Sequence, residues 1–291
     1  MITHIVDSTL REGLQTAGKP IFIDQYGPIE YVTLAHDSGL VDRFEVTWSP
    51  SLTPEALDKI KALGAKGVKL QAYVGPLEYF QPTDRPDLNS TDWTLVSTTL
   101  LHGNIPARSD LTQLQDRTNG APLRVGLECS GSNGVEEVIE TVATLSSYDE
   151  VEVISINDSN GRMSIEWIES FFGTIAGIDT NGHRIGFHIH NGELRAKDKA
   201  KLVLKCAELA GLVEIDLDAT AFGLGDRSGI LSIDDAAQLI GKGVAIESIS
   251  REIAGLFFKI NRKLGDLPDV AMSHYNNGII RPEYASTTKG I

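Results

Sequence analysis

Residues 2–15 read ITHIVDSTLREGLQ, a short β-branched run followed at once by a dense polar stretch. Ile, Val and Thr favour strands, so we predict a strand over Thr3–Val6. The residues after it include acids, an arginine and side chains with amide or hydroxyl groups, at a point where hydrophobic core residues would otherwise be expected. Polar density of this kind at the end of a buried strand predicts a functional site there.

The same β-rich pattern recurs along the chain, with room for a loop, a helix and a return loop between successive runs. The seven further strands that we predict are Arg43–Thr47, Val68–Tyr73, Leu95–Leu100, Leu123–Leu127, Glu150–Ile156, Arg184–His190 and Val213–Leu217.

Helical patterns fill several of the intervals. TPEALDKIKALG begins with a capping Thr53, places Pro54 at the first helical position and ends at Gly64. Residues 130–145 and 194–211 show apolar residues at steps of three and four, which is typical of a helix packed on one face.

Eight alternating units with near-continuous apolar strands predict a parallel sheet that is buried on both faces. They favour a closed (β/α)₈ TIM barrel over an open doubly wound sheet. We place the barrel at residues 1–245 and a C-terminal helix and extension at residues 246–291, because the alternation is lost there.

The composition of the 291 residues, with 41% hydrophobic and 23% charged, is that of a globular protein with a sizeable core. The net charge of −14 disfavours nucleic acid and anionic membranes as partners. The sequence shows no apolar run of membrane-spanning length and no signal-peptide pattern, so we expect a cytoplasmic location. Cys129 and Cys206 are far apart, which disfavours a cysteine-based zinc site.

RIGFHIHN, residues 184–191, places His188 and His190 two apart on a predicted strand, so both rings project from one face. Two imidazoles at a strand end suit Zn²⁺, Mn²⁺, Co²⁺ or Fe²⁺. The alternative is that one ring packs in the core and the other is solvated. A third ligand would come from another strand end, where Asp7 and Glu12 are available.

DSTLREGLQ, then HIHN, then GLGDRSG in this order resembles the metal-dependent pyruvate-carboxyltransferase superfamily of TIM barrels. That superfamily includes homocitrate synthase, isopropylmalate synthase and HMG-CoA lyase. The resemblance covers roughly residues 3–240 and is greatest to the condensing, homocitrate synthase-like members.

The resemblance implies that Glu12, His188 and His190 bind a divalent metal such as Zn²⁺, Mn²⁺, Mg²⁺ or Co²⁺. Arg11 would stand beside the metal and stabilise the enolate oxygen during carbon–carbon bond making or breaking. Three protein ligands are expected, because Ile230 stands where several members place a fourth ligand, an Asn.

The substrate-binding residues implied by the resemblance come from several strand ends. Asp7 would orient Arg11 and the strand end, Gln15 would line the pocket, and Asn191 would lie beside the metal ligands. Ser159 keeps the hydroxyl that members offer to the substrate carboxylate. His102 follows another strand and either faces substrate or caps a loop.

The general base has three candidates. His274, in SHYNNGII, resembles the His that the synthases deliver from a partner subunit, which would make the protein a homodimer; a surface His is the alternative. Glu45 and Glu128 are the candidates inside the barrel.

Two departures bear on the substrate. Gly126 stands where homocitrate synthases place an Arg for the distal carboxylate of 2-oxoglutarate, which argues against that substrate. The lyases carry a Cys in the Gly-rich loop, and residues 219–230 contain none, which favours synthesis.

We therefore predict an acyltransferase that condenses an acyl-CoA with a small 2-oxo acid to give a 2-hydroxy-2-alkyl acid. Acetyl-CoA is the favoured acyl-CoA. The second hypothesis is a carbon–carbon lyase or aldolase on the same metal site. The third is a barrel that has lost catalysis and serves as a scaffold.

Overall fold

The computed structural model describes residues 1–15, 27–47, 54–77, 91, 93–128, 130–223 and 229–242, apart from residues 101–104. The predicted C-terminal helix and extension, residues 246–291, lie outside these ranges.

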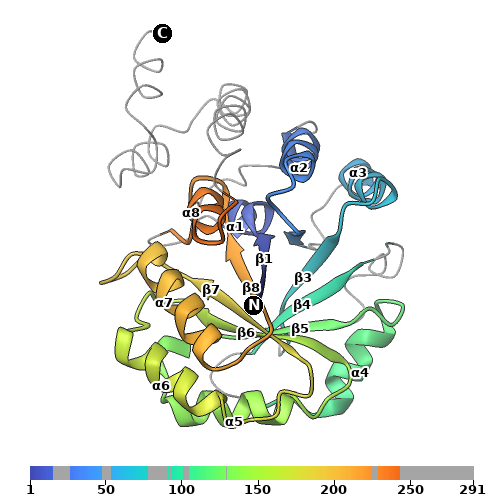
Figure 1. The fold of residues 1–291 in the computed structure, drawn as a ribbon. Helices are drawn as coiled ribbons and strands as arrows, with labels where there is room; N and C mark the ends of the chain where they lie inside the picture. Colours follow the sequence, from blue (N-terminus) through green and yellow to red (C-terminus); the bar gives the residue numbers. More distant parts are fainter. Residues whose placement is uncertain are drawn as a thin grey trace, which may run out of the picture.

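Eight parallel strands close into a barrel in sequence order, from β1 round to β8 and back to β1 (Figure 1). The predicted (β/α)₈ TIM barrel is therefore confirmed. The strands are β1 (Ile2–Asp7), β2 (Arg43–Thr47), β3 (Leu70–Pro76), β4 (Leu95–Leu100), β5 (Leu123–Leu127), β6 (Val151–Asp158), β7 (Arg184–Ile189) and β8 (Glu214–Ala219).

The described helices lie between strands in the sequence, except that α8 follows β8, and they cover the outside of the barrel (Figure 1). They are α1 (Thr9–Gln15), α2 (Gly27–Asp37), α3 (Pro54–Ala65), α4 (Arg108–Asp116), α5 (Val135–Leu145), α6 (Ile165–Ile175), α7 (Ala196–Leu209) and α8 (Ile233–Leu239), with short 3₁₀ turns η4 (Ser130–Ser132) and η5 (Ala221–Gly223).

Local sequence sets several helix ends. α3 begins at Pro54, as predicted, because proline fits the first turn of a helix. Ser164 and Ser232 cap α6 and α8 by accepting hydrogen bonds from Trp167 N and Asp235 N. After α7 the chain turns at Gly211 with a φ of +78°, a backbone conformation that favours glycine.

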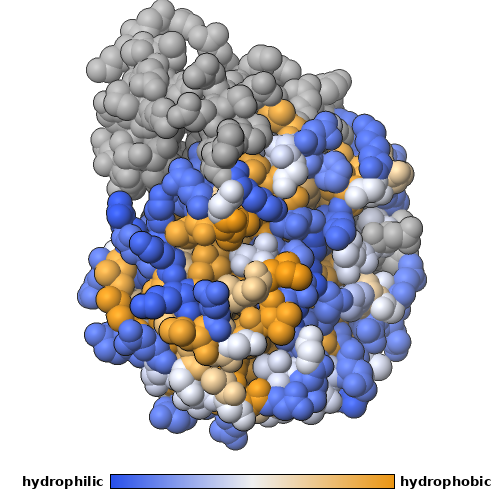
Figure 2. All heavy atoms as spheres, in the orientation of Figure 1, coloured by the Kyte–Doolittle hydropathy of each residue, from blue (hydrophilic) through white to orange (hydrophobic). Residues whose placement is uncertain are grey.

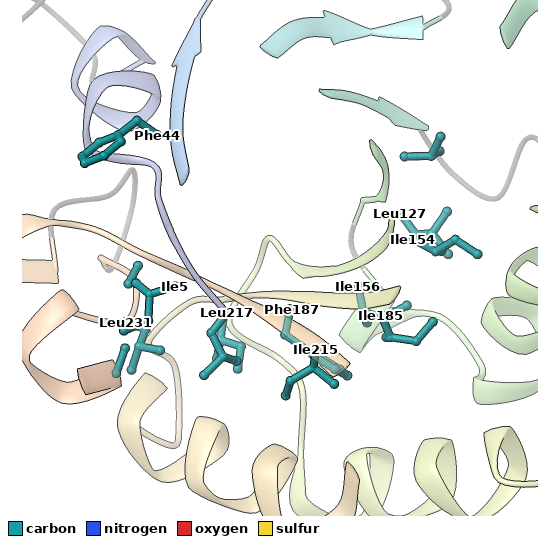
Figure 3. Close-up of a cluster of buried hydrophobic side chains, with 14 of the residues drawn as sticks. Ile5, Phe44, Leu127, Ile154, Ile156, Ile185, Phe187, Ile215, Leu217 and Leu231 are labelled. Atoms are coloured by element: carbon teal, nitrogen blue, oxygen red, sulfur yellow. The ribbon is translucent and has the colours of Figure 1, made fainter. Parts of the chain in front are cut away.

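The strands alternate between an apolar face toward the helices and a polar face toward the barrel axis. On β8, Ile215 and Leu217 lie on the helix side with Phe187 of β7 (Figure 3). Asp216 and Asp218 therefore face inward, since successive side chains of a strand point to opposite sides. The same parity places inside the barrel the buried polar residues Arg43, Glu45, Gln71, Ser97, Thr99, Arg124, Ser155, Asn157 and His188.

A polar interior is unusual, because TIM barrels are commonly filled with Val, Ile and Leu. The hydrophobic core of this protein lies instead between the sheet and its helices (Figure 3). Charged groups inside the barrel need partners close by, since an unpaired buried charge is costly. The interior is therefore organised by ion pairs and hydrogen bonds.

One face of the molecule shows hydrophobic side chains within a mostly hydrophilic surface (Figure 2). No helix in the described ranges combines the length and the apolar composition needed to cross a bilayer.

Candidate active site

The turn between β1 and α1 is held by Asp7. Its carboxylate accepts hydrogen bonds from Thr9 N at 2.8 Å, from the Thr9 hydroxyl and from the Tyr31 hydroxyl. Burial raises the pKa of Asp7 to about 6, although the hydrogen bonds from Thr9 and Tyr31 work in the opposite direction. Asp7 thus fixes the first turn of the helix that carries Arg11 and Glu12.

Arg11 lies buried among acids at the carboxyl end of the barrel. Its Nη1 is 3.2 Å from Glu12 Oε1, and its Nε is 3.5 Å from Glu45 Oε2. The guanidinium also stacks over Tyr73, with Cζ 4.4 Å from the ring centroid. Burial opposes the charge, but Glu45 and Glu12 outweigh it and hold the pKa of Arg11 well above its usual value. Arg11 is therefore a permanent cation.

Glu45 is held in place from the neighbouring strands. Gln71 Nε2 donates to its Oε1 at 2.6 Å, and Ser8 Oγ donates to its Oε2 at 3.3 Å. This carboxylate is only 2% exposed. Its negative charge stabilises the Arg11 cation from the barrel interior.

His188 and His190 meet at the carboxyl end of β7, as the HxH spacing predicts. Their Nε2 atoms lie 3.1 Å apart, and Glu12 Oε1 is 3.8 Å from His188 Nε2. The structure therefore brings these three predicted side chains together. The alternative of one core ring and one solvated ring is wrong, since both are buried against each other.

The other nitrogen of His188 is held by Asp218 of β8. His188 Nδ1 lies 3.0 Å from Asp218 Oδ2, and Arg124 Nη2 of β5 donates to Asp218 Oδ1 at 2.7 Å. Burial would raise the pKa of Asp218, but Arg124 and His188 outweigh it and lower that pKa to about 2. Asp218 is therefore an ionised acceptor inside the barrel.

The donor set fits a divalent metal. Two ligand nitrogens bound to one tetrahedral ion at about 2.0–2.1 Å stand roughly 3.3 Å apart, close to the 3.1 Å between the two Nε2 atoms. A carboxylate on the far nitrogen of a metal-binding His is also a common arrangement. Within the described residues no group of three or more His, Cys, Asp and Glu side chains has the geometry of a complete metal site. Glu12 lies nearer to Arg11 than to His188.

A second acid lies across the barrel mouth, between the ends of β5 and β6. Glu128 accepts a hydrogen bond from the Ser159 hydroxyl, and Asn157 Nδ2 is 3.4 Å from Glu128 Oε1. A Cβ on Gly126 would come within 2.6 Å of Asn157 Nδ2. The space beside Gly126 is therefore filled by Asn157, and the group presented to the site is a carboxylate.

Hydrogen bonds connect the ends of β6 and β7, and the loop after β7, to helix α7. Asn191 Oδ1 accepts from Ala196 N at 2.9 Å, which places Asn191 at the start of that helix. The fully buried Lys199 donates to Asp158 Oδ2 at 2.6 Å and to His190 O at 3.1 Å. Ile230 pairs with His190 through a β-bridge and is buried.

Three of the predicted site residues are not placed by the structure. His102, His274 and the side chain of Gln15 lie outside what the structure describes, as do residues 224–228 of the Gly-rich loop. Their roles stay predictions.

The sequence reading missed Asp218 and Arg124. The signal was present: β8 reads EIDLDA and β5 reads LRVGL, in which polar and apolar residues alternate. An alternating strand has one polar face, and a closed barrel turns that face inward.

No protein-family model matches the chain, and no curated protein matches it in sequence. Solved structures do match. The carboxyltransferase domain of Rhizobium etli pyruvate carboxylase, solved with pyruvate, has a TM-score of 0.66 and 13% identity over 89% of this chain. A pyruvate carboxylase variant from the same bacterium, solved with its allosteric activator acetyl coenzyme A, has a TM-score of 0.64 and 14% identity over 90% of this chain and 27% of its own.

An HMG-CoA lyase from Acinetobacter baumannii, solved with coenzyme A and 3-methylmalate, has a TM-score of 0.60 and 15% identity over 88% of this chain and 91% of its own. The chain spans 47% of the carboxyltransferase domain structure, about half of it. At these identities the likeness establishes the shared barrel fold.

Proposed function

We propose that this chain is a metal-dependent enzyme of carbon–carbon bond chemistry, of the pyruvate-carboxyltransferase superfamily, which condenses acetyl-CoA with a small 2-oxo acid. The observation that carries the proposal is the meeting of Arg11, Glu12, His188 and His190 at the carboxyl end of the barrel. Structural neighbours solved with pyruvate, or with coenzyme A and 3-methylmalate, support this substrate class.

Glu12, His188 and His190 are the residues that would hold the metal. When bound, a divalent ion supplies a Lewis acid that positions a 2-oxo acid and polarises its keto group. The acids around the site attract a cation: Glu12, Glu45 and Glu128 all act on Arg11.

Arg11 stabilises the negative oxygen that develops during the reaction. Deprotonation of the acetyl methyl group places charge on the thioester oxygen, and attack on the keto group places charge on the new alkoxide. A guanidinium that stays ionised serves in both steps without a proton transfer of its own. The acids and Tyr73 around Arg11 hold it in one orientation.

Glu128 is the better placed of the two acids inside the barrel to act as the base. Glu45 is closed in by Gln71 and Ser8, whereas Glu128 is part-exposed and lies at the rim with Ser159. A base must reach the proton that it removes. His274 stays the alternative from the sequence.

The region around Gly126 limits the oxo acid. Asn157 occupies the space that a long cationic side chain at position 126 would need, and Glu128 presents a negative group. A second carboxylate on the substrate would be repelled there. We therefore propose a 2-oxo acid with a short, uncharged chain.

A lyase on the same site is the second candidate. It is favoured by the HMG-CoA lyase structure, of which this chain covers 91%. Cleavage uses the same groups in reverse, with Arg11 stabilising the enolate that leaves. The cytoplasmic location and the homodimer stay predictions from the sequence.

The test is to incubate the purified, metal-supplemented protein with acetyl-CoA and each of several 2-oxo acids, and to follow free thiol and the condensed acid. Condensation, followed by hydrolysis of the product thioester by water, predicts thiol release that requires the oxo acid, with pyruvate or 2-oxobutyrate preferred to 2-oxoglutarate. Thiol release without an oxo acid would point to hydrolysis. Formation of acetyl-CoA or a 2-oxo acid from a hydroxyacyl substrate, without condensation, would favour the lyase.

A further inference from the structure

A chain of buried hydrogen bonds runs beneath the paired histidines. His188 Nδ1 lies 3.0 Å from Asp218 Oδ2, and Arg124 Nη2 is 2.7 Å from Asp218 Oδ1. Arg124 also donates to Ser155 Oγ at 2.7 Å. The three ionisable groups come from β7, β8 and β5, so the contact spans the barrel and no two of them belong to one strand.

This contact determines which nitrogen of His188 carries the hydrogen. An ionised carboxylate only accepts, so Nδ1 must donate, and in the neutral ring Nε2 keeps its lone pair. Arg11 Nη1 also lies near Nδ1, at 3.5 Å, but a guanidinium cannot accept the hydrogen. The shorter contact to Asp218 therefore prevails. The free lone pair then faces His190 and Glu12.

The chain continues to the other acid of the site. Ser155 Oγ donates to Asn157 Oδ1 at 2.9 Å, and Asn157 Nδ2 is 3.4 Å from Glu128 Oε1. Two strand glycines leave room for it: a Cβ at Gly186 would lie 3.2 Å from Arg124 Nη2, and one at Gly126 would lie 2.6 Å from Asn157 Nδ2. Arg124 is thus linked to His188 through Asp218, and to Glu128 through Ser155 and Asn157.

The geometry points to Asp218, fixed by Arg124, as a positioning residue that holds His188 in the tautomer able to bind a divalent metal through Nε2. This inference rests on the proposed function, and it adds two residues that act through His188 without touching the substrate. The competing explanation is that Arg124–Asp218 merely fills the barrel with a neutral pair.

Asp218→Asn separates the two explanations. The Asn side chain has one oxygen and one NH₂ group, and Arg124 can only be satisfied by the oxygen. The NH₂ group then faces His188 Nδ1, which must accept, so the ring hydrogen moves to Nε2. That tautomer cannot bind a metal through Nε2.

The matched control is Asp216→Asn. Asp216 lies two residues earlier on β8, is equally buried and is paired with Arg43, but its contacts are with arginines. Both variants replace an aspartate of β8 that is paired with a buried arginine of another strand. A purely structural role predicts the same consequences for metal binding in both.

Two measurements are made on the wild type and on both variants. Calorimetric titration with Zn²⁺ or Co²⁺ gives the affinity, and long-range ¹H–¹⁵N NMR of the metal-free, ¹⁵N-histidine-labelled protein gives the tautomer. We expect about 10–100-fold weaker binding and an Nε2-protonated His188 in Asp218→Asn. We expect wild-type affinity and an Nδ1-protonated His188 in Asp216→Asn.

Equal affinity and an unchanged tautomer in Asp218→Asn would overturn the inference. Should that variant not fold, Arg124→Lys and its control Arg43→Lys take its place, with weaker metal binding expected only in the first. A wild-type protein that binds no metal, yet shows the Nδ1-protonated His188, would instead overturn the proposed function. The two failures are therefore distinguishable.

Discussion

Asp216 and Asp218 stand two residues apart on β8, face the same interior and are each paired with an arginine, yet their surroundings differ. At the amino end, Asp216 lies between Arg43 and Arg184, so its partners are all cations. At the carboxyl end, Asp218 has one arginine on one oxygen and His188 on the other. The same strand pattern yields a closed ion pair at one end and a contact with a proposed metal ligand, His188, at the other.

The two ends differ in exposure as well. At the amino end, His4 contacts Asp42 and Glu214 and is part-exposed, as is Arg184, which also pairs with Glu152. At the carboxyl end, Arg11, Glu12 and both histidines are almost fully buried. Arg43 and Asp216 are buried at the amino end too, so the two ends differ in their outermost charges, which are part-exposed at the amino end and buried at the carboxyl end.

The largest expected effect is on stability at the amino end. Asp216→Asn leaves Arg43 buried without its counter-charge, and breaking a buried pair in this way costs about 3–5 kcal/mol. Urea unfolding should report this loss while turnover of the folded variant stays at the wild-type level. A large loss of turnover per folded molecule would show that the two ends are not separate in function.

The next effect is on catalysis at the carboxyl end. Arg11→Lys should lower turnover by about 10²–10³-fold, because a compact ammonium cannot replace the planar group against the developing oxyanion. Metal affinity should change little. Arg184→Lys at the amino end is the control and should keep full turnover. Full activity in Arg11→Lys would show that Arg11 does not stabilise that oxygen.

A pH effect is expected from Asp7. Its folded pKa of about 6 lies above its ordinary 3.8, so the folded state binds the proton more tightly than the unfolded state. Stability should therefore fall as pH rises from about 4 to about 6, by about 3 kcal/mol at about 1.4 kcal/mol per pH unit. Asp7→Asn should flatten this part of the pH profile of urea unfolding. An unchanged slope would mean that Asp7 is ionised at both pH values.

The smallest effect is expected from His4. Hydrogen bonding to Asp42, opposed by burial and aided by Glu214, raises the pKa of His4 above 6.5. Its contribution to stability is complete below 6.5 and is lost as pH rises through the raised value. The pair is part-exposed, so the loss should be about 1 kcal/mol or less. His4→Gln should remove this step, which lies in a higher pH range than that of Asp7; a step of unchanged size would assign it to another group.

The sequence predicted most of the fold. β2, β4 and β5 have the predicted bounds, because short β-branched runs ended by turn residues define a strand locally. β3 runs from Leu70 to Pro76 and so ends later than predicted, beyond an irregularity in its pairing with β4. Pairing between strands depends on residues that are distant in the sequence, so the local sequence pattern does not predict where a paired strand ends.

Four of the predicted site residues meet in the structure, and each belongs to a motif at the end of a strand. Arg11, Glu12, His188 and His190 were brought together by their positions at strand ends. Asp218 was not found, because we read the strands as near-continuous apolar runs and the alternation in EIDLDA was overlooked. Its partnership with Arg124 could not be read locally either, since the two are 94 residues apart.

The most direct test of the central claim is the metal stoichiometry of the purified protein. Zn²⁺ or Co²⁺ is titrated into the wild type, into Glu12→Gln and into Glu214→Gln, which alters the acid beside His4 at the amino end. We predict about one ion per chain in the wild type and in Glu214→Gln, and loss of tight binding in Glu12→Gln. An absence of binding in the wild type, or equal binding in all three, would contradict the account.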